Sequence, residues 1–173
     1  MIYFITGGAR SGKSSYAMKL ALTLTENPVY IATARKWDDD FQDRINRHVK
    51  DRDDRWTSLE VEKELSKVNL AGKVALIDCV TLWLTNFFVD NKQDIEKCLS
   101  EAKAELNSLA SGKGKLIIVS NELGMGVHAS TPAGRKFTDL QGWVNQHIAA
   151  LADEVVLMVS GIPVKIKSSN ADH

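Results

Sequence analysis

Gly7-Gly8-Ala9-Arg10-Ser11-Gly12-Lys13-Ser14 is the most informative stretch of this 173-residue chain. It fits the pattern G-x-x-x-x-G-K-[ST] of a phosphate-binding P-loop. An apolar run over residues 2–6 predicts a short buried strand before it, and apolar residues at helical spacing from Ser15 to Leu24 predict a helix after it. Strand, loop and helix in this order are the setting that the motif requires, which disfavours the alternative of a glycine-rich turn before an ordinary helix.

The residue types of this loop suit phosphate binding. Glycines let the backbone curl so that successive N–H groups point at phosphate oxygens, and the N-terminus of the following helix adds partial positive charge. Lys13 is expected to reach the β- and γ-phosphates, and the Ser14 hydroxyl is expected to ligate Mg²⁺. The candidate phosphate-binding residues are therefore Gly7, Gly8, Ala9, Arg10, Ser11, Gly12, Lys13 and Ser14.

Composition and charge narrow the function classes. The length predicts one domain, taken as residues 1–167, with residues 168–173 as a frayed tail. A formal net charge of zero gives no electrostatic footprint for nucleic acid or an anionic membrane. No apolar run is long enough for a transmembrane helix, and a core strand stands where a signal peptide would, so we expect a cytoplasmic enzyme. Cys79 and Cys98 lie in apolar surroundings, which predicts buried free thiols rather than a disulfide or metal site.

Further apolar runs predict a parallel sheet. They occupy residues 29–32, 74–77, 116–119 and 155–159 and are separated by helical patterns. Continuous apolar strands of this kind indicate a sheet covered on both faces. Residues 162–166, after Gly161, can return as an antiparallel edge strand, where Pro163 is tolerated. We therefore expect an α/β P-loop NTPase fold of the RecA-like class, with a mostly parallel central sheet, flanking helices and a short antiparallel edge near the C-terminus.

Two later helices have continuous apolar stripes. The first ends before Gly112 and Gly114, and the second begins at Thr131-Pro132. The stripe of the first is Ile95, Cys98, Leu99, Ala102, Leu106 and Leu109, and that of the second is Phe137, Leu140, Val144, Ile148 and Leu151.

The segment 37–56 is unusually rich in charge. Apolar residues recur there at every fourth position, namely Trp37, Phe41, Ile45 and Val49, and His48 falls beside this stripe. Periodicity alone favours a surface helix with a solvated charged face. The alternative is a basic platform beside the P-loop, with a histidine directed at a nucleotide.

Acidic residues follow two of the predicted strands. Asp78 has the position of a Walker B carboxylate that holds Mg²⁺ directly or through water, although it could equally cap the next helix. Glu122 is a candidate catalytic base, or a group that contacts Mg²⁺ indirectly. Gly124 and Gly126 after it would allow close approach to a ligand, although each alone is more simply part of a turn.

The remaining histidines are poorer candidates. His128 falls in a loop, His147 on a helix and His173 in the tail. A lone histidine is more often structural or solvated than catalytic.

Several segments taken in order closely resemble the bifunctional adenosylcobinamide kinase / adenosylcobinamide-phosphate guanylyltransferase family of cobalamin biosynthesis. The resemblance covers residues 2 to about 167, and the P-loop alone would be generic. The segments that carry it are residues 7–14, Tyr30-Ile31-Ala32-Thr33, Arg44-Ile45 through His48 to Trp56, Asp78-Cys79-Val80-Thr81 with Thr85-Asn86, Ser120-Asn121-Glu122-Leu123-Gly124-Met125-Gly126, and residues 159–167.

The resemblance implies two reactions. A nucleoside triphosphate, ATP or GTP, phosphorylates the primary hydroxyl of adenosylcobinamide. GTP then transfers GMP to an enzyme histidine, which the motif places at His48, and adenosylcobinamide phosphate takes up that GMP. Neutral imidazole suits this role because its ordinary pKa lies near 6.5.

The resemblance also implies a guanine-nucleotide site. It implies a homo-oligomer as well, because relatives are described as trimers. The residues placed at this site are Thr33, Ala34, Arg35, Val49, Lys50, Asp51, Arg52, Glu60 and Asp78. Two departures concern nucleotide preference: Arg52-Asp53 stands where many relatives carry Arg-Pro, and Asp78 where many carry Glu.

Two other functions remain open at this stage. A single-activity P-loop small-molecule kinase would use the same loop with a merely structural His48. A P-loop regulatory ATPase with a protein partner would hydrolyse nucleotide without needing a corrinoid.

Overall fold

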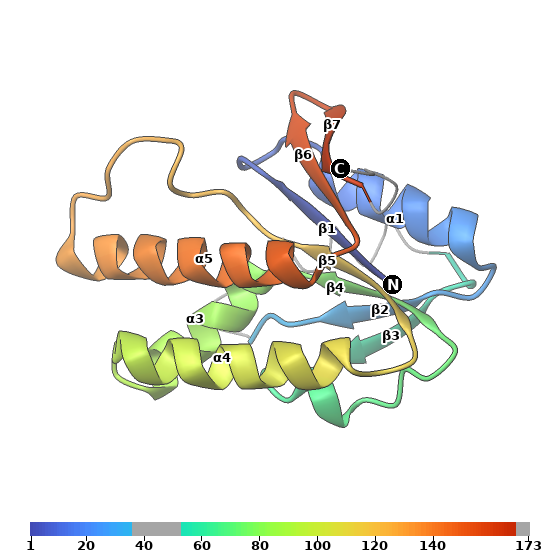
Figure 1. The fold of residues 1–173 in the computed structure, drawn as a ribbon, viewed down its shortest axis with the longest axis horizontal. Helices are drawn as coiled ribbons and strands as arrows, with labels where there is room; N and C mark the ends of the chain where they lie inside the picture. The colour runs from blue at the N-terminus through green and yellow to red at the C-terminus, as the bar shows by residue number, and fades with distance from the viewer. Residues whose placement is uncertain (36–52, 169–173) are drawn as a thin grey trace.

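A seven-stranded sheet forms the centre of the computed structural model, which describes residues 1–35 and 53–168 (Figure 1). The strand order is β3-β2-β4-β5-β1-β6-β7. The strands are β1 (Ile2–Gly7), β2 (Val29–Ala32), β3 (Thr57–Glu60), β4 (Val74–Asp78), β5 (Lys115–Val119), β6 (Glu154–Val159) and β7 (Ile162–Lys167). The helices are α1 (Lys13–Leu24), the 3-10 turn η1 (Leu65–Lys67), α3 (Val80–Asp90), α4 (Ile95–Ala110) and α5 (Pro132–Leu151).

The pairing of the strands confirms the predicted fold class. Strands β1 to β6 pair in parallel, and β7 pairs antiparallel with β6. One strand, β5, lies between the P-loop strand β1 and the strand β4 that ends at Asp78. Because parallel strands end at the same edge, the P-loop, Asp78 and the segment after β5 meet there.

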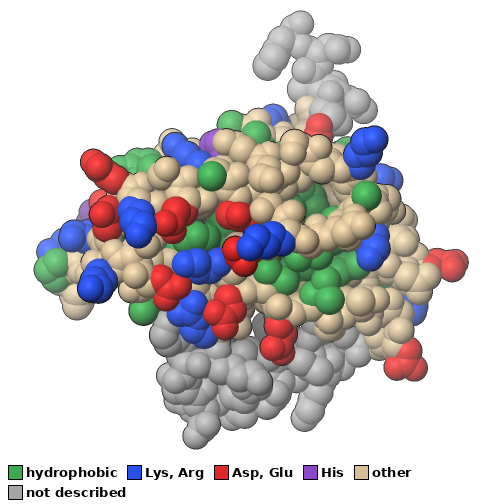
Figure 2. Space-filling view, turned by 90° about the horizontal axis from the view of Figure 1, so that it is seen from below, with side chains coloured by type: hydrophobic (Ala, Val, Ile, Leu, Met, Phe, Trp, Pro, Cys, Tyr) green, Lys and Arg blue, Asp and Glu red, His purple; other side chains and the backbone are tan. Residues whose placement is uncertain are grey.

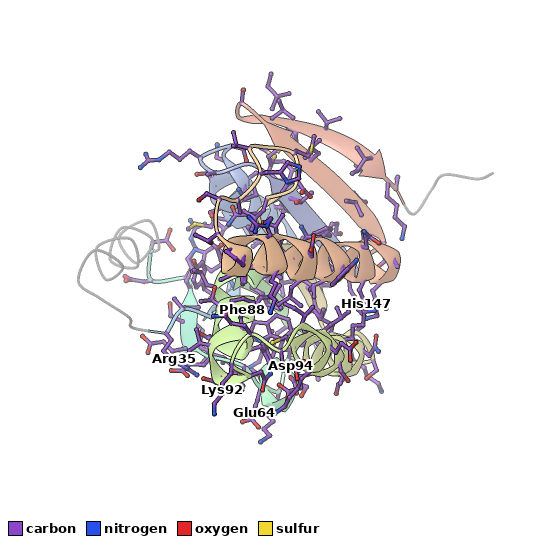
Figure 3. The ribbon with its side chains drawn as sticks, turned by 90° about the vertical axis from the view of Figure 1, so that its left-hand side faces the viewer. Arg35, Glu64, Phe88, Lys92, Asp94 and His147 are labelled. Carbon is purple, nitrogen blue, oxygen red and sulfur yellow. The ribbon has the colours of Figure 1, made fainter. Side chains whose placement is uncertain are left out.

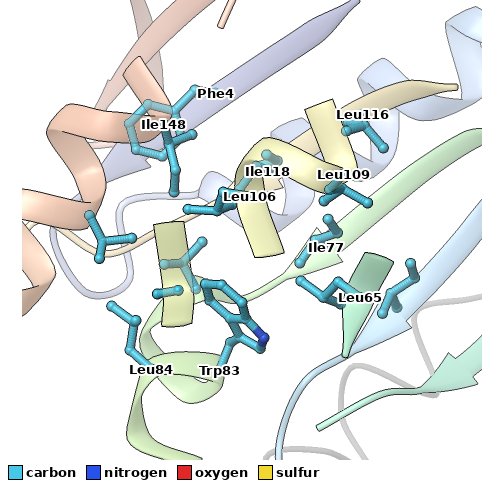
Figure 4. Close-up of a cluster of buried hydrophobic side chains, with 14 of the residues drawn as sticks. Phe4, Leu65, Ile77, Trp83, Leu84, Leu106, Leu109, Leu116, Ile118 and Ile148 are labelled. Atoms are coloured by element: carbon cyan, nitrogen blue, oxygen red, sulfur yellow. The ribbon is translucent and has the colours of Figure 1, made fainter. Parts of the chain in front are cut away.

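Helices cover both faces of the sheet, as expected for parallel strands. Helices α3, α4 and α5 bury one face, and α1 packs on the other (Figure 1). The hydrophobic layer between the sheet and helices α3, α4 and α5 contains side chains such as Phe4, Ile77, Trp83, Leu106 and Ile148 (Figure 4). The indole N–H of Trp83, although buried, donates to the Lys63 carbonyl at 2.8 Å.

Side chains cap the N-termini of α4 and α5, and the cap of α5 confirms the predicted start at Thr131-Pro132. The Thr131 hydroxyl accepts a hydrogen bond from Gly134 N at 3.0 Å, and Pro132 occupies the first turn of α5. Asp94 caps α4 in the same way, accepting from Lys97 N. Ser and Thr hydroxyls or Asp carboxylates at such positions satisfy backbone donors that the first helical turn leaves unpaired.

Strand β3 was not predicted. Three of its four residues, Thr57, Ser58 and Glu60, are exposed, so it lacks the apolar pattern of a buried strand. Backbone pairing with β2 holds it, including the bond from Val61 N to Ala32 O at 2.9 Å. The helix predicted within residues 37–56 and the end of the predicted tail lie outside the described residues, apart from residues 53–56 and Ser168.

Candidate nucleotide-binding site

The P-loop links β1 to α1 through a backbone conformation that its sequence allows. Gly12, the residue before α1, has a φ of 93°, in the left-handed region that favours glycine. A Cβ on Gly7 would lie 2.5 Å from the Met158 carbonyl oxygen, so this position also requires glycine. Arg10 has a φ of 57°, in the left-handed region that non-glycine residues rarely adopt. Such local backbone strain is often found at ligand-binding sites.

Lys13 is held inside this loop. Its Nζ donates to the Gly8 carbonyl at 2.6 Å, and the residue is only 7% exposed. Burial lowers the pKa of Lys13, and the nearby Asp78 carboxylate opposes that shift. A buried ammonium group is costly unless an anion compensates it, which makes Lys13 a candidate for binding an anion.

The β6–β7 hairpin supports the loop from the other side. Gly161 N, between the two strands, donates to the Ser11 carbonyl at 3.0 Å. A Cβ on Gly12 would lie 3.4 Å from Gly161 Cα. The C-terminal hairpin therefore fixes the backbone of the N-terminal phosphate loop.

Asp78 ends β4 at the same edge of the sheet. Its Oδ2 accepts a hydrogen bond from the Tyr30 hydroxyl at 3.0 Å, and the Tyr30 ring packs edge-on against Trp56 at a centroid distance of 6.1 Å. Burial and the Asp78 charge raise the pKa of the neighbouring Cys79 thiol to about 12. Cys79 and Cys98 are buried free thiols, as predicted.

The segment after β5 is joined directly to the P-loop. Glu122 N donates to the Gly7 carbonyl at 2.9 Å, and Glu122 Oε1 accepts from Gly124 N at 2.9 Å. Glu122 is half-buried. Its backbone therefore lies beside the first residue of the phosphate loop, as its position at the end of a neighbouring strand predicted.

A buried polar network behind Glu122 was not predicted. The Ser120 hydroxyl and the Gln141 amide both donate to Asn145 Oδ1, at 2.7 and 3.1 Å. Asn145 Nδ2 donates to the Asn121 carbonyl at 3.0 Å, and Asn121 Nδ2 donates to the Thr81 hydroxyl at 3.0 Å. The sequence signal was present: Gln141 and Asn145 are polar residues four apart beside the apolar stripe of α5.

The segment after β2 is held by α3. Thr33 is buried and its hydroxyl donates to the Cys79 carbonyl at 2.8 Å. The buried Asn86 amide donates to the carbonyls of both Thr33 and Glu62, at 2.9 and 2.8 Å. This one side chain therefore ties the chain after β2 to the chain after β3.

Arg35 makes ion pairs within the protein. Its guanidinium donates to Asp90 through two nitrogens, at 2.8 and 3.2 Å, and to Glu62 at 2.7 Å. These hydrogen bonds, that of Asp90 first, raise the pKa of Arg35. Hydrogen bonds from Arg35 and then Lys63 hold the pKa of Asp90 well below its usual range. Glu60, at the end of β3, is exposed.

Comparison with known proteins assigns the chain to a family. A family profile described as "Cobinamide kinase / cobinamide phosphate guanyltransferase" matches residues 3–166. The chain belongs to this family. Its activities are therefore those of a bifunctional cobinamide kinase and guanylyltransferase of cobalamin biosynthesis.

Curated relatives support the assignment over nearly full lengths. The chain is 37% identical to the bifunctional adenosylcobalamin biosynthesis protein CobU of Escherichia coli (strain K12), over 96% of this chain and all of the relative. It is 38% identical to the corresponding CobP of Pseudomonas aeruginosa, over 94% and 95% of the two chains. It is 35% identical to CobU of Salmonella typhimurium, over 96% of this chain and all of the relative.

Two solved structures have a more distant likeness. The flagellar accessory protein FlaH from Methanocaldococcus jannaschii has a TM-score of 0.47 and 13% identity, over 96% of this chain and 78% of that one. The second structure, an ATPase domain, has a TM-score of 0.44 and 12% identity, over 90% and 68% of the two chains.

The remaining candidate residues are His48 with residues 49–52, His147 and His128. His48 and residues 49–52 lie outside the described residues. His147 is on the opposite side of the molecule from Arg35 (Figure 3), and its Nε2 lies 2.9 Å from Asn107 Oδ1. A surface hollow of about 700 Å³ beside His147 lies between α4 and α5, away from the P-loop. His128 is exposed in the loop after β5.

The distribution of charged side chains on the surface agrees with the formal net charge of zero. Acidic and basic side chains are interspersed on the face seen in Figure 2. Within residues 1–35 and 53–168, no helix is both long and apolar enough to cross a membrane.

Proposed function

We propose that this cobinamide kinase and guanylyltransferase binds its nucleotide at residues 7–14 and transfers GMP through a covalent intermediate on His48. The observation that carries the proposal is the buried Lys13 ammonium, folded onto Gly8 inside a loop built for phosphate. Nucleoside triphosphate is the ligand that this geometry fits best.

In the kinase reaction, the primary hydroxyl of adenosylcobinamide attacks the γ-phosphorus of ATP or GTP. An O–P bond forms, the bond to the β–γ bridging oxygen breaks, and the nucleoside diphosphate leaves. Lys13 stabilises the charge on the phosphates. We assign Glu122, whose backbone is fixed to Gly7, to accept the proton of the hydroxyl.

The residues present fit Mg²⁺. Asp78 presents a carboxylate at the end of β4, positioned by its bond from Tyr30, and Ser14 presents a hydroxyl in the first turn of α1. The described residues contain no cluster of three or more acidic, histidine or cysteine side chains for a metal. An ion at this place would be held by one carboxylate, one hydroxyl, water and the phosphates of the nucleotide. When bound, the ion neutralises phosphate charge.

In the guanylyl transfer, an imidazole nitrogen of His48 attacks the α-phosphorus of GTP and pyrophosphate leaves. A phosphate oxygen of adenosylcobinamide phosphate then attacks the same phosphorus, breaks the N–P bond and gives adenosylcobinamide-GDP. The covalent step divides one displacement into two easier ones. Residues expected around the guanine nucleotide are Thr33, Ala34, Arg35, Val49, Lys50, Asp51, Arg52 and Glu60.

The ion pairs of Arg35 with Glu62 and Asp90 bear on the role that we propose for Arg35 in the guanine-nucleotide site. Because Asp90 and Glu62 already occupy the guanidinium, we assign Arg35 to holding the chain beside the nucleotide rather than to gripping a phosphate. Thr33 and Ala34 would then contact the nucleotide mainly through a backbone that α3 keeps in place.

The proposal includes a homo-oligomer, with three copies as the expected number. Ile162, Val164 and Ile166 of β7 are 43–65% exposed, and exposed apolar side chains on an edge strand are suited to covering by another copy. The nucleotide substrates are consistent with action in the cytoplasm.

Intact-protein mass spectrometry after incubation with GTP and Mg²⁺ tests the covalent step. We expect an acid-labile GMP adduct on the wild type and none on His48→Ala, with His128→Ala as the matched control that keeps the adduct. Folded wild-type protein that phosphorylates cobinamide but never acquires GMP would contradict the role of His48 and leave a single-activity kinase.

A further inference from the structure

The loop between β5 and α5 carries apolar side chains that face solvent. Met125 is 78% exposed and Val127 is 97% exposed. Val127 has the highest exposed fraction among the exposed large hydrophobic residues of the described chain. Contiguous exposed apolar residues on a loop beside a reactive site commonly mark a binding surface.

Both ends of this loop are fixed. At its start, Glu122 N is bonded to the P-loop at Gly7, and Asn121 is bonded to Thr81. At its end, the Arg135 guanidinium donates to the carbonyls of Ala129 and Ser130, each at 3.1 Å. The loop leaves the sheet at the P-loop edge and runs out to the start of α5 (Figure 1).

The apolar residues are within reach of the phosphate loop. Met125 is the third residue after Glu122, so the Cα atoms of the two lie at most about 11 Å apart. A substrate whose hydroxyl lies at the γ-phosphate must extend beyond the P-loop, because the loop encloses only the phosphates. Met125 and Val127 are exposed on the loop that continues from Glu122, so they are candidates for contact with the rest of a large substrate.

We propose that Met125 and Val127 form an apolar support for one face of the corrin ring of cobinamide. This assignment rests on the proposed binding of nucleotide phosphates at residues 7–14. A corrin is a broad, mostly apolar macrocycle with amide groups on its rim, so its face requires apolar contact and its edge requires polar partners. Nucleotide phosphates and ribose require no such surface.

The residue types of the loop suit this occupant. Methionine is unbranched and polarisable and adapts to irregular apolar surfaces. A Cβ on Gly126 would meet no atom within 4 Å. No other part of the described chain therefore fills the space next to Gly126, between the two apolar residues. The apolar face of β7, by contrast, belongs to the other end of the chain and is the surface assigned above to a second copy.

Equilibrium dialysis with dicyanocobinamide, followed by its visible absorbance, tests the assignment. The variant is Met125→Ser combined with Val127→Ser, and the matched control is Val89→Ser, an exposed valine on α3. Each methylene removed from a buried contact weakens binding roughly fourfold, so we expect Kd for the corrinoid, and KM for cobinamide in the kinase reaction, to rise about tenfold or more. KM for the nucleotide, the GMP adduct and the molecular mass are expected to be unchanged, and Met125→Leu is expected to keep most of the affinity.

Three results would overturn the assignment. The first is an unchanged corrinoid Kd in the double variant. The second is a loss of nucleotide binding that parallels the loss of corrinoid binding. The third is a fall in molecular mass, which would attribute the weaker corrinoid binding to dissociation of the oligomer. The wild-type GMP adduct and kinase activity, measured in the same series, report on the proposed function separately.

Discussion

Lys13 is a cation that the protein buries before any phosphate is bound. Its lowered pKa has burial as its largest cause, so the positive charge costs stability in the empty protein. The same charge becomes favourable when phosphate enters. Lys13 is therefore a residue at which stability and function oppose each other.

This opposition predicts the behaviour of Lys13→Met, which keeps the apolar stem of the side chain. We expect the nucleotide-free variant to melt at a higher temperature than the wild type, by about 2–4 °C for each kcal/mol gained. Both activities are expected to fall by about 10²-fold or more. Calorimetry with and without GTP measures the first effect, and Lys19→Met, an exposed lysine on α1, is the control. A lower melting temperature for Lys13→Met would show that the buried charge is already compensated.

Tyr30 acts on Asp78 through one hydrogen bond. The Tyr30→Phe variant removes that donor and leaves the ring against Trp56. We expect a loss of about 0.5–1.5 kcal/mol in stability and a shift in the Mg²⁺ concentration needed for half-maximal kinase activity. Asp78→Asn is expected to shift the Mg²⁺ requirement further. A Mg²⁺ titration of both variants measures this, and equal Mg²⁺ requirements in all three proteins would remove Asp78 from the metal site.

At the scale of elements, the network of Ser120, Gln141 and Asn145 joins α5 to the end of β5. Through Asn121 it reaches Thr81 at the start of α3. Removal of one member leaves buried polar partners unpaired, and each such group costs about 1–3 kcal/mol. The network therefore fixes the segment that carries Glu122.

Asn145→Ala is expected to destabilise the protein by about 2–3 kcal/mol. Combination with Ser120→Ala in a double-mutant cycle is expected to give a coupling energy within about 0.5–3 kcal/mol. Urea unfolding measures both, and Gln146→Ala, an exposed neighbour, is expected to change stability by less than about 0.5 kcal/mol. Strict additivity of the two changes would mean that the hydroxyl and the amide act independently.

The Arg35–Asp90 contact joins α3 to the chain after β2 and gives a pH dependence of known sign. Because the pKa of Asp90 is held below its usual range, its stabilisation is complete above the unfolded pKa of about 3.9 and is lost as pH falls below it. The stability difference between wild type and Asp90→Asn is therefore expected to be constant near neutral pH and to shrink in acid.

The partly exposed positions of Arg35 and Asp90 limit this difference to about 1 kcal/mol. Urea unfolding at several pH values measures it. Glu64→Gln, which removes the more exposed pair with Lys67, is the control and is expected to have little effect at any pH. A difference that grows in acid would contradict the assigned cause of the pKa shift.

At the scale of the whole molecule, the apolar surface of β7 predicts the state of assembly. We expect the wild type to have about three times the 19.1 kDa mass of one chain. Val164→Lys is expected to shift it toward a single copy, because it places a charge where apolar side chains meet. Light scattering after gel filtration measures both masses, with Val89→Lys as control. A wild type that is already a single chain at micromolar concentration would reject the oligomer.

Much of the architecture was legible in the sequence because it depends on local patterns. The buried strands, the helix start at Thr131 and the P-loop follow from apolar runs and from the chemistry of single positions. Strand β3 was missed because it is short, polar and held by backbone bonds to β2.

The site was only partly predictable. The partners of Arg35 lie 27 and 55 residues away, and no local rule connects such distant positions. The same holds for the bond between Gly161 and Ser11. The placement of Glu122 beside Gly7, in contrast, followed from the rule that parallel strands end at a common edge.

The position of β1 inside the sheet, between β5 and β6, has a consequence for biosynthesis. Its two neighbours, β5 and β6, are made from residues 115–119 and 154–159, and the bond that steadies Ser11 comes from residue 161. At about 5–20 residues per second, the ribosome finishes these partners on the order of ten seconds after it completes β1. During that interval β1 lacks both of its neighbours in the sheet. Nucleotide therefore cannot help the chain to fold until nearly all of its length has been translated.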